Sequence, residues 1–238
     1  MKYLLNILLP LFVLTACEGP PTPRLARYSV HGIDVSHYQS RINWAELDSL
    51  TVHFAFIKAT EGISYADSLF ERNWEALGAT DIRRGAYHFF RPEAPPGEQA
   101  RHFVRTVTLE TGDLPPVLDI ELIGSLPKYE LVRRLRVWLD IVENNMGVKP
   151  IIYTNLYFYN RHLAGHFTGY PLWIARYHDR EPILADGNDW AFWQYGKQGR
   201  LPGIRGHVDF NVFNGTLEQL DSLRIPNPKV MELSERLR

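Results

Sequence analysis

The stretch Pro115-Pro116-Val117-Leu118-Asp119-Ile120-Glu121 places two carboxylates at the end of a short apolar run that prolines introduce. Such a run is typical of a β-strand, and the alternation of a strand would put Asp119 and Glu121 on one face together with Val117. Neighbouring acids in a poorly solvated place raise each other's pKa, so one of them is expected to hold a proton. This arrangement suits general-acid chemistry on a glycosidic oxygen, although two solvated acids in a loop would also fit the segment.

Outward from this stretch, short β-type runs alternate with helical patterns along the chain. Strands followed by helices indicate a parallel sheet. The predicted strands are 31–35, 52–59, 84–90, 117–121 and 150–154, and the helices that follow them are 44–50, 67–77, 97–109, 128–144 and 156–166. Three further strand-like runs, at 171–177, 190–195 and 207–210, come without convincing helices between them. Eight strands and five helices predict a single-domain α/β barrel related to the (β/α)8 type, with its last third trimmed.

Composition narrows the class of protein. A chain of 238 residues that is 45% hydrophobic and 22% charged is within reach of one domain with a single core. The formal net charge is -1 and the basic residues are scattered, so the chain lacks the electrostatic pattern of a nucleic-acid-binding protein. Aromatic residues make up 13% of the chain, and Trp and Tyr at loop ends suit both a core and a sugar-binding cleft.

The N-terminus is predicted to be a lipoprotein signal peptide over residues 1–16. Lys2 precedes a short apolar segment, and Leu14-Thr15-Ala16-Cys17 resembles the bacterial lipobox, in which the cysteine carries lipid. The alternative is a plain secretory signal that happens to end at a cysteine. Cys17 is the single cysteine, which excludes an intramolecular disulfide. A Pro-rich tether at 17–27, a catalytic barrel at 28–225 and a tail at 226–238 complete the expected order.

Side chains that are able to take part in catalysis or binding lie at the end of nearly every predicted strand. In barrels of parallel strands the active site lies at the carboxyl-terminal rim. Loops are polar in any case, but this does not explain why acids recur directly after apolar strands. The residues at strand ends are Asp34, Thr60, Glu61, His88, Asp119, Glu121, Tyr153, Asn155, Arg176, Gln194, Tyr195 and Asp209.

Eight short motifs, taken in their order along the chain, resemble a known protein family. Each motif alone is modestly specific, but the ordered set over roughly residues 30 to 213 resembles the lysozymes of glycoside hydrolase family 25. The segments that carry the resemblance are His31-Gly32-Ile33-Asp34-Val35-Ser36-His37-Tyr38-Gln39, Phe54-Ala55-Phe56-Ile57-Lys58-Ala59-Thr60-Glu61-Gly62, Gly85-Ala86-Tyr87-His88-Phe89, Leu118-Asp119-Ile120-Glu121, Ile152-Tyr153-Thr154, Leu172-Trp173-Ile174-Ala175-Arg176-Tyr177, Trp193-Gln194-Tyr195 and Val208-Asp209-Phe210-Asn211.

The resemblance implies a (β/α)5β3 barrel with N-acetylmuramidase activity, which cleaves the β-1,4 bond between N-acetylmuramic acid and N-acetylglucosamine in peptidoglycan. It implies Glu121 as the general acid/base, Asp119 as its partner carboxylate, and Asp34 and Asp209 as further acids at the cleft floor. Ser40 and Asn43 depart from the residues that many members carry, and both lie in the loop after the first strand.

The substrate-binding residues follow from the rim pattern. We expect sugar contacts from Tyr87, Tyr153, Trp173, Tyr195, Gln194 and Glu61, although the aromatic residues also suit a core and Glu61 a turn. His88 is expected to be a hydrogen-bonded core group. No cofactor or metal is expected, because the acids are spread over several strands without an Asp-rich loop of calcium spacing.

Both sugars of the expected substrate carry a 2-acetamido group, which favours cleavage with retention. In that mechanism the acetamido group attacks the anomeric carbon, Glu121 protonates the leaving oxygen and Asp119 orients the acetamido nitrogen; Asp119 as direct nucleophile is the alternative. A chitin-type glycosidase and a non-catalytic wall-binding lipoprotein stay open as other functions. We expect a monomer anchored by lipid in the bacterial cell envelope, at the outer membrane, facing the periplasm or the exterior.

Overall fold

The computed structural model of the chain describes residues 22–48 and 52–226. The predicted signal peptide, Cys17 and the tail beyond Pro226 lie outside the described residues. Within them the strands form one sheet in the order β1-β9-β8-β7-β6-β5-β4-β2-β3, and pairing of β1 with β2 closes it into a barrel. The strands are β1(His31–Val35), β2(Phe54–Glu61), β3(Tyr65–Ala66), β4(Arg83–Phe89), β5(Val117–Asp119), β6(Ile151–Asn155), β7(Leu172–Ala175), β8(Phe192–Gly199) and β9(Val208–Phe213).

The strand directions confirm the predicted architecture. Strands β1, β2, β4, β5, β6, β7 and β8 run parallel to their neighbours in that series. Strand β9 is antiparallel to both β8 and β1, and the short β3 pairs only with β2. The carboxyl ends of seven strands in the described chain therefore meet at one rim, as a trimmed (β/α)5β3 barrel requires.

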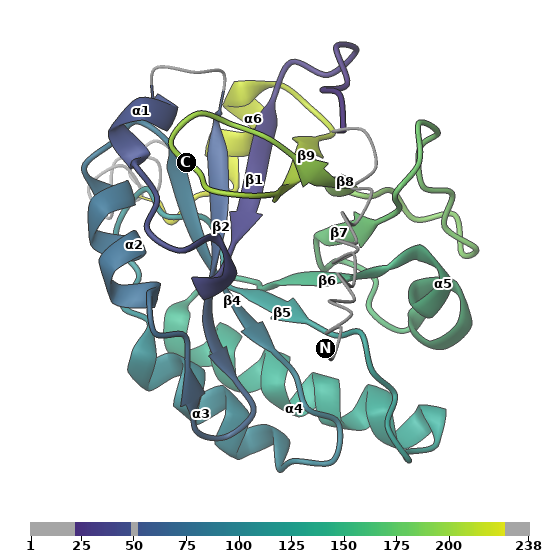
Figure 1. Cartoon of the computed structure of the whole chain (residues 1–238). Coiled ribbons are helices and arrows are strands. Elements are labelled where there is room, and N and C mark those ends of the chain that lie inside the picture. Colours follow the sequence, from purple (N-terminus) through teal and green to yellow (C-terminus); the bar gives the residue numbers. More distant parts are fainter. Residues whose placement is uncertain (1–21, 49–51, 227–238) are drawn as a thin grey trace, which may run out of the picture.

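Helices cover the outside of the ring of strands. Figure 1 shows α1 to α4 wrapped around one side of the barrel. The helical elements are η1(His37–Gln39), α1(Trp44–Asp48), α2(Phe70–Gly78), α3(Pro96–Thr106), α4(Lys128–Met146), α5(Leu156–Phe158), η2(Tyr159–Leu163) and α6(Leu217–Ser222). Among the described residues no helix combines the length and the apolar character that a membrane span requires.

The interior of the barrel is filled by large aromatic side chains. The Phe56 ring stacks on Trp173 with centroids 4.6 Å apart, and Phe192 packs edge-on against both Phe54 and Phe56. A Cβ atom at Gly32 would lie 2.3 Å from the Phe54 ring, so glycine is needed where this ring crosses β1. Close packing of these rings holds the strands, and with them the residues at the strand ends, in fixed positions.

Among the α-helices, two differ from the prediction. The helix expected at 156–166 is only the short α5, capped by the Asn155 side chain, followed by the π-helical turn η2. Helix α6 was not predicted, although Thr216 and Gln219 form a capping box at its start and so provided a sequence signal.

Candidate active site

A pocket of about 250 Å³ opens at the carboxyl-terminal rim of the barrel. Its lining comes from eight strands or the residues that follow them, as the rim position of barrel active sites predicts. The lining residues are Asp34, Val35, Ser36, Tyr38, Gln39, Lys58, Tyr87, Phe89, Asp119, Glu121, Tyr153, Trp173, Tyr177, Gln194 and Asp209. All four predicted acids are therefore brought together.

The first acid pair lies at the junction of β1 and β9, where Asp34 and Asp209 are register partners. The Asp34 carboxylate accepts hydrogen bonds from Asn211 Nδ2 at 2.7 Å and from Gln194 Nε2 at 2.9 Å. Burial raises the pKa of Asp34 despite these two donors, and burial together with the charge of Asp34 raises the pKa of Asp209 to about 8. Near neutral pH this pair is expected to hold a proton.

The second acid pair, Asp119 and Glu121, comes from the stretch at residues 115–121. Asp119 is the last residue of β5 and is 6% exposed, whereas Glu121 follows two residues later, beyond the end of the strand. The strand predicted over 117–121 is thus shorter: β5 ends at Asp119, and the Ile120 N–H makes its last hydrogen bond to β6, at the Tyr153 carbonyl. Both side chains nevertheless line the same pocket.

The electrostatics of this second pair are those of a proton-sharing site. Burial and the neighbouring charge of Glu121 raise the pKa of Asp119 well above its ordinary value. Burial also raises the pKa of Glu121, although the Tyr153 hydroxyl and Lys58 oppose the rise. Asp119 Oδ1 is buried and has no hydrogen-bond partner within the described chain, so it is available to a donor from a bound molecule.

A network of neutral polar groups joins the two pairs. The hydroxyls of Tyr153 and Tyr177 donate to Gln194 Oε1 at 2.7 and 3.0 Å, and Gln194 Nε2 in turn donates to Asp34. On the other side of Asp34, Trp173 Nε1 donates to Asn211 Oδ1 at 2.8 Å. Each buried donor is therefore matched to an acceptor, which holds the acids in fixed positions.

Comparison with known proteins identifies the family to which this barrel belongs. The family model "Glycosyl hydrolases family 25" matches residues 33–204. The chain belongs to glycosyl hydrolase family 25. This family 25 enzyme is 47% identical to the protein YegX of Escherichia coli K12 over 202 residues, covering 83% of the chain and 74% of the relative. It is 36% identical to lysozyme M1 of Streptomyces globisporus over 209 residues, covering 82% and 71%.

Solved structures agree with the fold. The structure of a family 25 glycosyl hydrolase from Bacillus anthracis superposes with a TM-score of 0.80 at 32% identity, covering 87% of this chain and 99% of that one. The chain is therefore a glycoside hydrolase, and the resemblance read from its motifs is confirmed.

Two of the predicted substrate-binding residues do not line the pocket of this family 25 enzyme. Tyr195 is buried on the outer face of β8, where its ring packs against Trp193 and Phe210. Adjacent residues of a strand face opposite ways, so Gln194 and Tyr195 cannot both point into the barrel. The expectation of a sugar contact from Tyr195 is corrected accordingly.

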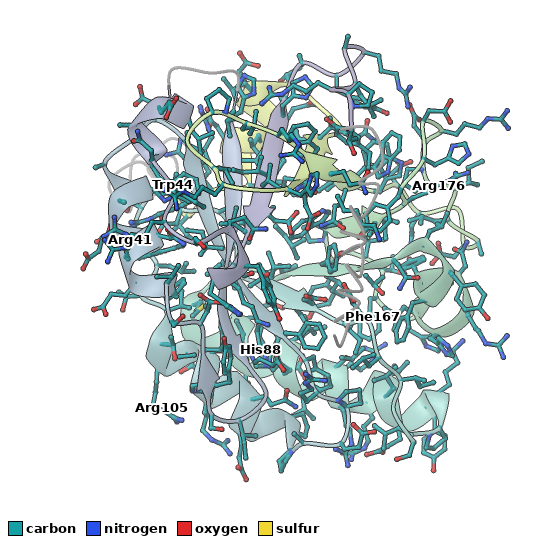
Figure 2. All side chains as sticks on the ribbon, viewed as in Figure 1. Arg41, Trp44, His88, Arg105, Phe167 and Arg176 are labelled. Atoms are coloured by element: carbon teal, nitrogen blue, oxygen red, sulfur yellow. The ribbon has the colours of Figure 1, made fainter. Side chains whose placement is uncertain are left out.

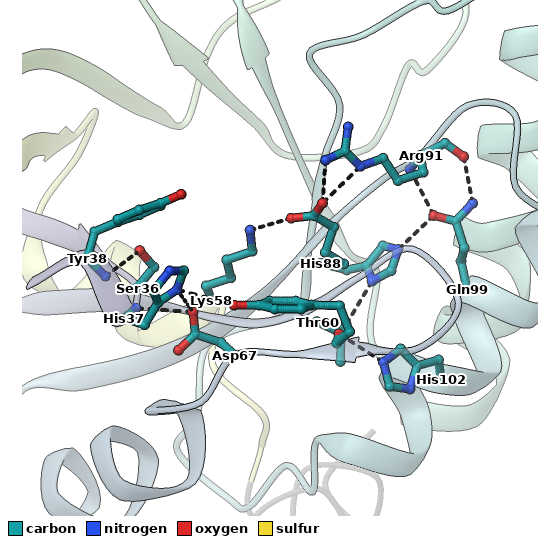
Figure 3. Close-up of polar contacts among 12 residues, drawn as sticks. Ser36, His37, Tyr38, Lys58, Thr60, Asp67, His88, Arg91, Gln99 and His102 are labelled. Carbon is teal, nitrogen blue, oxygen red and sulfur yellow. Dashed lines mark hydrogen bonds and ion pairs between the residues drawn. The ribbon is translucent and has the colours of Figure 1, made fainter. Parts of the chain in front are cut away.

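The other residue outside the pocket lining is Glu61. Its carboxylate accepts a hydrogen bond from Lys58 Nζ at 2.6 Å and pairs with the Arg91 guanidinium, as Figure 3 shows. These cations lower the pKa of Glu61 in spite of its partial burial. Glu61 therefore holds Lys58, and Lys58 lines the pocket beside the acids.

His88 occupies the position expected of a core histidine. Its side chain is fully buried between the Thr60 hydroxyl at 2.7 Å and Gln99 Oε1 at 3.2 Å, and its ring stacks on Trp138. Burial lowers the pKa of His88 to about 3, so it stays neutral. Figure 2 places the labelled His88 below the ring of strands, and Arg176 with the loop after β7.

Several residues that line the pocket or hydrogen-bond to its acids were not predicted as site residues. Asn211 follows Asp209 at the same-face spacing of a strand, and Tyr177 comes directly after β7, so the pattern that identified the acids could also have identified these two. Lys58 carried no such signal, because a lysine inside an apolar strand has no obvious partner in the sequence. Among the described residues no group of three or more His, Cys, Asp or Glu side chains is arranged to hold a metal ion.

Proposed function

We propose that this family 25 enzyme is an N-acetylmuramidase that cleaves the β-1,4 bond between N-acetylmuramic acid and N-acetylglucosamine in peptidoglycan. The observation that carries the proposal is the pair Asp119 and Glu121, two carboxyls of raised pKa on the wall of one rim pocket. Raised carboxyl pKa values are what a general acid needs near neutral pH. The name of the relative lysozyme M1 supports the same substrate.

In the proposed mechanism Glu121 is the proton donor, because it lies beyond the strand and is the less buried of the two acids. It protonates the glycosidic oxygen as the bond breaks, and later takes a proton from the attacking water. Lys58 and the Tyr153 hydroxyl limit the rise of the Glu121 pKa. They keep the group able to donate and to recover its proton.

Asp119 is proposed to act on the substrate's 2-acetamido group. Its unpartnered Oδ1 is suited to accept the amide N–H, which would align the acetamido oxygen for attack on the anomeric carbon and give retention. A donor at this oxygen favours the ionised form of Asp119, so substrate binding would leave the shared proton on Glu121. Asp119 as direct nucleophile is the alternative within the same geometry.

The floor pair Asp34 and Asp209 has a supporting part in this proposal. Oδ2 of Asp34 accepts hydrogen bonds from both Gln194 and Asn211, and Asp34 and Asp209 both line the pocket with a raised pKa. We infer that the pair holds Gln194, and through it the Tyr153 hydroxyl, in place beside Glu121. Tyr87, Tyr153 and Trp173 remain the proposed contacts for the sugar rings.

The product ends test the function. Purified peptidoglycan digested by the enzyme and reduced with borohydride should release muropeptides that end in reduced muramic acid, as mass spectrometry would show. Reduced glucosamine at the ends, or no release at all, would contradict a muramidase. Faster cleavage of chitin oligomers than of peptidoglycan would favour the chitin-type alternative, and EDTA should leave the activity unchanged.

We further propose that Cys17 is lipidated, so that the enzyme works as a monomer tethered to the cell envelope, at the outer membrane. This rests on the lipobox-like Leu14-Thr15-Ala16-Cys17 and on the Pro-rich segment after it. Membrane fractionation and sedimentation of the full-length protein test the anchor and the monomer separately.

A further inference from the structure

A second pocket of about 410 Å³ lies beside the active site, on the outer side of the loop after β7. Tyr177 lines both pockets, so the two pockets share this side chain as a wall. The Tyr177 hydroxyl reaches Gln194 in the active site, while its ring lies 5.3 Å from Lys197 Nζ. The remaining lining of the second pocket is Thr22, Pro23, Leu25, His178, Asp179, Tyr195, Gly196 and Gln198.

One wall of this pocket comes from an arm, residues 22–28, that precedes the region matched by the family. The arm lies within the predicted tether, but it is docked on the barrel: Thr22 N donates to the Gln198 carbonyl at 3.1 Å, and Gln198 N donates to Thr22 Oγ1. A Cβ atom at Gly196 would lie 2.1 Å from Thr22 Cγ2, so glycine on β8 is what permits this approach.

The arm also fixes the loop that carries Tyr177. Arg27 donates to the Asp179 carbonyl at 2.7 Å, and the Tyr28 hydroxyl donates to Glu181 Oε1 at 2.5 Å. The Tyr28 ring packs edge-on against Trp190 and Trp193. The second pocket is therefore a built feature with walls from two distant parts of the chain.

The chemistry of the pocket points to one kind of ligand. Its exposed surface is mostly apolar, from Pro23, Leu25 and the Tyr177 ring. Its cation is Lys197, which is exposed and forms no ion pair with a carboxylate in the described part of the chain. The acid in the lining, Asp179, is paired with His178. An apolar surface beside an exposed ammonium suits a short peptide that ends in or carries a carboxylate.

We propose that this second pocket binds the carboxylate-bearing stem peptide of the muramic acid residue whose glycosidic bond lies in the active site, with Lys197 as the carboxylate contact. The proposal rests on the proposed function, because in peptidoglycan the peptide hangs from the sugar beside the cleaved bond. A volume of about 410 Å³ is in the range of pockets that hold small molecules, about 300–1,000 Å³.

The test compares soluble glycan strands that carry stem peptides with the same strands stripped by an amidase. For each enzyme the ratio of kcat/KM on peptide-bearing strands to kcat/KM on stripped strands is measured through released reducing ends. The ratio should exceed one for the wild type and fall roughly two- to fivefold in Lys197→Met, as expected for loss of one exposed charge contact. Lys197→Arg should retain most of it.

Two further variants sharpen the result. Lys149→Met removes a lysine with a similar ring contact, 5.5 Å from Tyr170, that does not line either pocket, and it should leave the ratio unchanged. Gly196→Ala displaces Thr22 without changing any charge, and it should lower the ratio as well. Thermal melting shows that each variant is folded.

The outcomes separate the two proposals. If Lys197→Met slows both kinds of strand equally, the lysine acts through the charge of Asp209 or on the glycan, and the peptide site is wrong. An unchanged ratio in both Lys197→Met and Gly196→Ala would overturn it too. If the wild type releases no reducing ends from either kind of strand, the muramidase function itself has failed.

Discussion

Asp34 on β1 and Asp209 on β9 face each other across two antiparallel strands, as register partners in an otherwise parallel barrel. The reversal of β9 is what brings the amino-terminal end of that strand, and with it Asp209, to the same rim as the carboxyl end of β1. Two carboxyls of raised pKa in such proximity make the junction of β1 and β9 sensitive to pH.

The Asp34–Asp209 pair should make stability fall as pH rises. A carboxyl whose pKa is raised in the folded protein stabilises the fold fully below its unfolded pKa of about 4, and the contribution is lost as the pH passes its folded value, about 8 for Asp209. Asp209→Asn should therefore flatten the decrease between pH 5 and 9, by on the order of 1 kcal/mol or more. Urea unfolding across this range is the measurement, with the exposed Asp179→Asn as control. An unchanged slope in Asp209→Asn would contradict the shared proton.

The two tyrosines that donate to Gln194 should have different effects on the pH profile. The Tyr153 hydroxyl lowers the pKa of Glu121, so Tyr153→Phe should raise that pKa further and move the alkaline limb of activity to higher pH. Tyr177→Phe removes a comparable bond to Gln194 without that contact to Glu121, and should leave the limb in place. Each variant should lose roughly two- to tenfold in kcat, the cost of one hydrogen bond. An equal shift of the alkaline limb in both variants would show that Gln194, not the Tyr153 hydroxyl, controls the pKa of Glu121.

The sequence predicted the barrel and the meeting of four acids because both depend on local alternation. Strands in which apolar residues alternate, each followed by a helix, determine a parallel order of the strands in the sheet. This order brings Asp34, Asp119 and Glu121 to one rim. The same rule, applied consistently, would have excluded Tyr195, since its neighbour Gln194 already faces inward.

Other parts of the site depend on contacts that no local pattern contains. Glu61 is neutralised by Arg91, which is 30 residues away, and the arm at residues 22–28 reaches β8 more than 150 residues later in the chain. A Pro-rich composition predicts a stiff segment but not where it packs. Tertiary packing alone decides whether such a segment is a free tether or a wall.

At the opposite end of the barrel, a buried ion pair should govern stability without touching activity. Arg84, at the start of β4, donates from Nε to Asp113 Oδ1 at 2.7 Å, and both side chains are about nine-tenths buried. Arg84→Met leaves the Asp113 charge unpaired and should cost about 3–5 kcal/mol of unfolding free energy. Arg133→Met, which breaks an exposed pair with Glu130, should cost much less. Chemical denaturation of both variants decides, and similar losses would contradict this ranking.

The proposed lipid anchor would depend on one atom, the Cys17 sulfur. Cys17→Ser should abolish lipidation and leave the precursor uncleaved by the lipoprotein signal peptidase, because serine lacks the thiol that receives the lipid. Metabolic labelling with a fatty acid analogue measures this directly. Equal label in Cys17→Ser and the parent protein would show that the lipobox-like Leu14-Thr15-Ala16-Cys17 is incidental.

The roles of Glu121 and Asp119 can be separated by the leaving group. Glu121→Gln should lose about 10²–10⁴-fold on peptidoglycan but much less on an activated aryl glycoside, whose leaving group needs no proton. Asp119→Asn should slow both substrates alike, because the interaction it removes is with the attacking acetamido group.

Asp119→Asn should also move the alkaline limb of any residual activity to lower pH. In the wild type the last proton leaves a site that already carries a neighbouring negative charge, and this charge is absent once Asp119 is an amide. The two variants are compared on both substrates, and the limb is followed in Asp119→Asn. Rescue of Asp119→Asn by the good leaving group, with none for Glu121→Gln, would mean that Asp119 is the proton donor and Glu121 its partner.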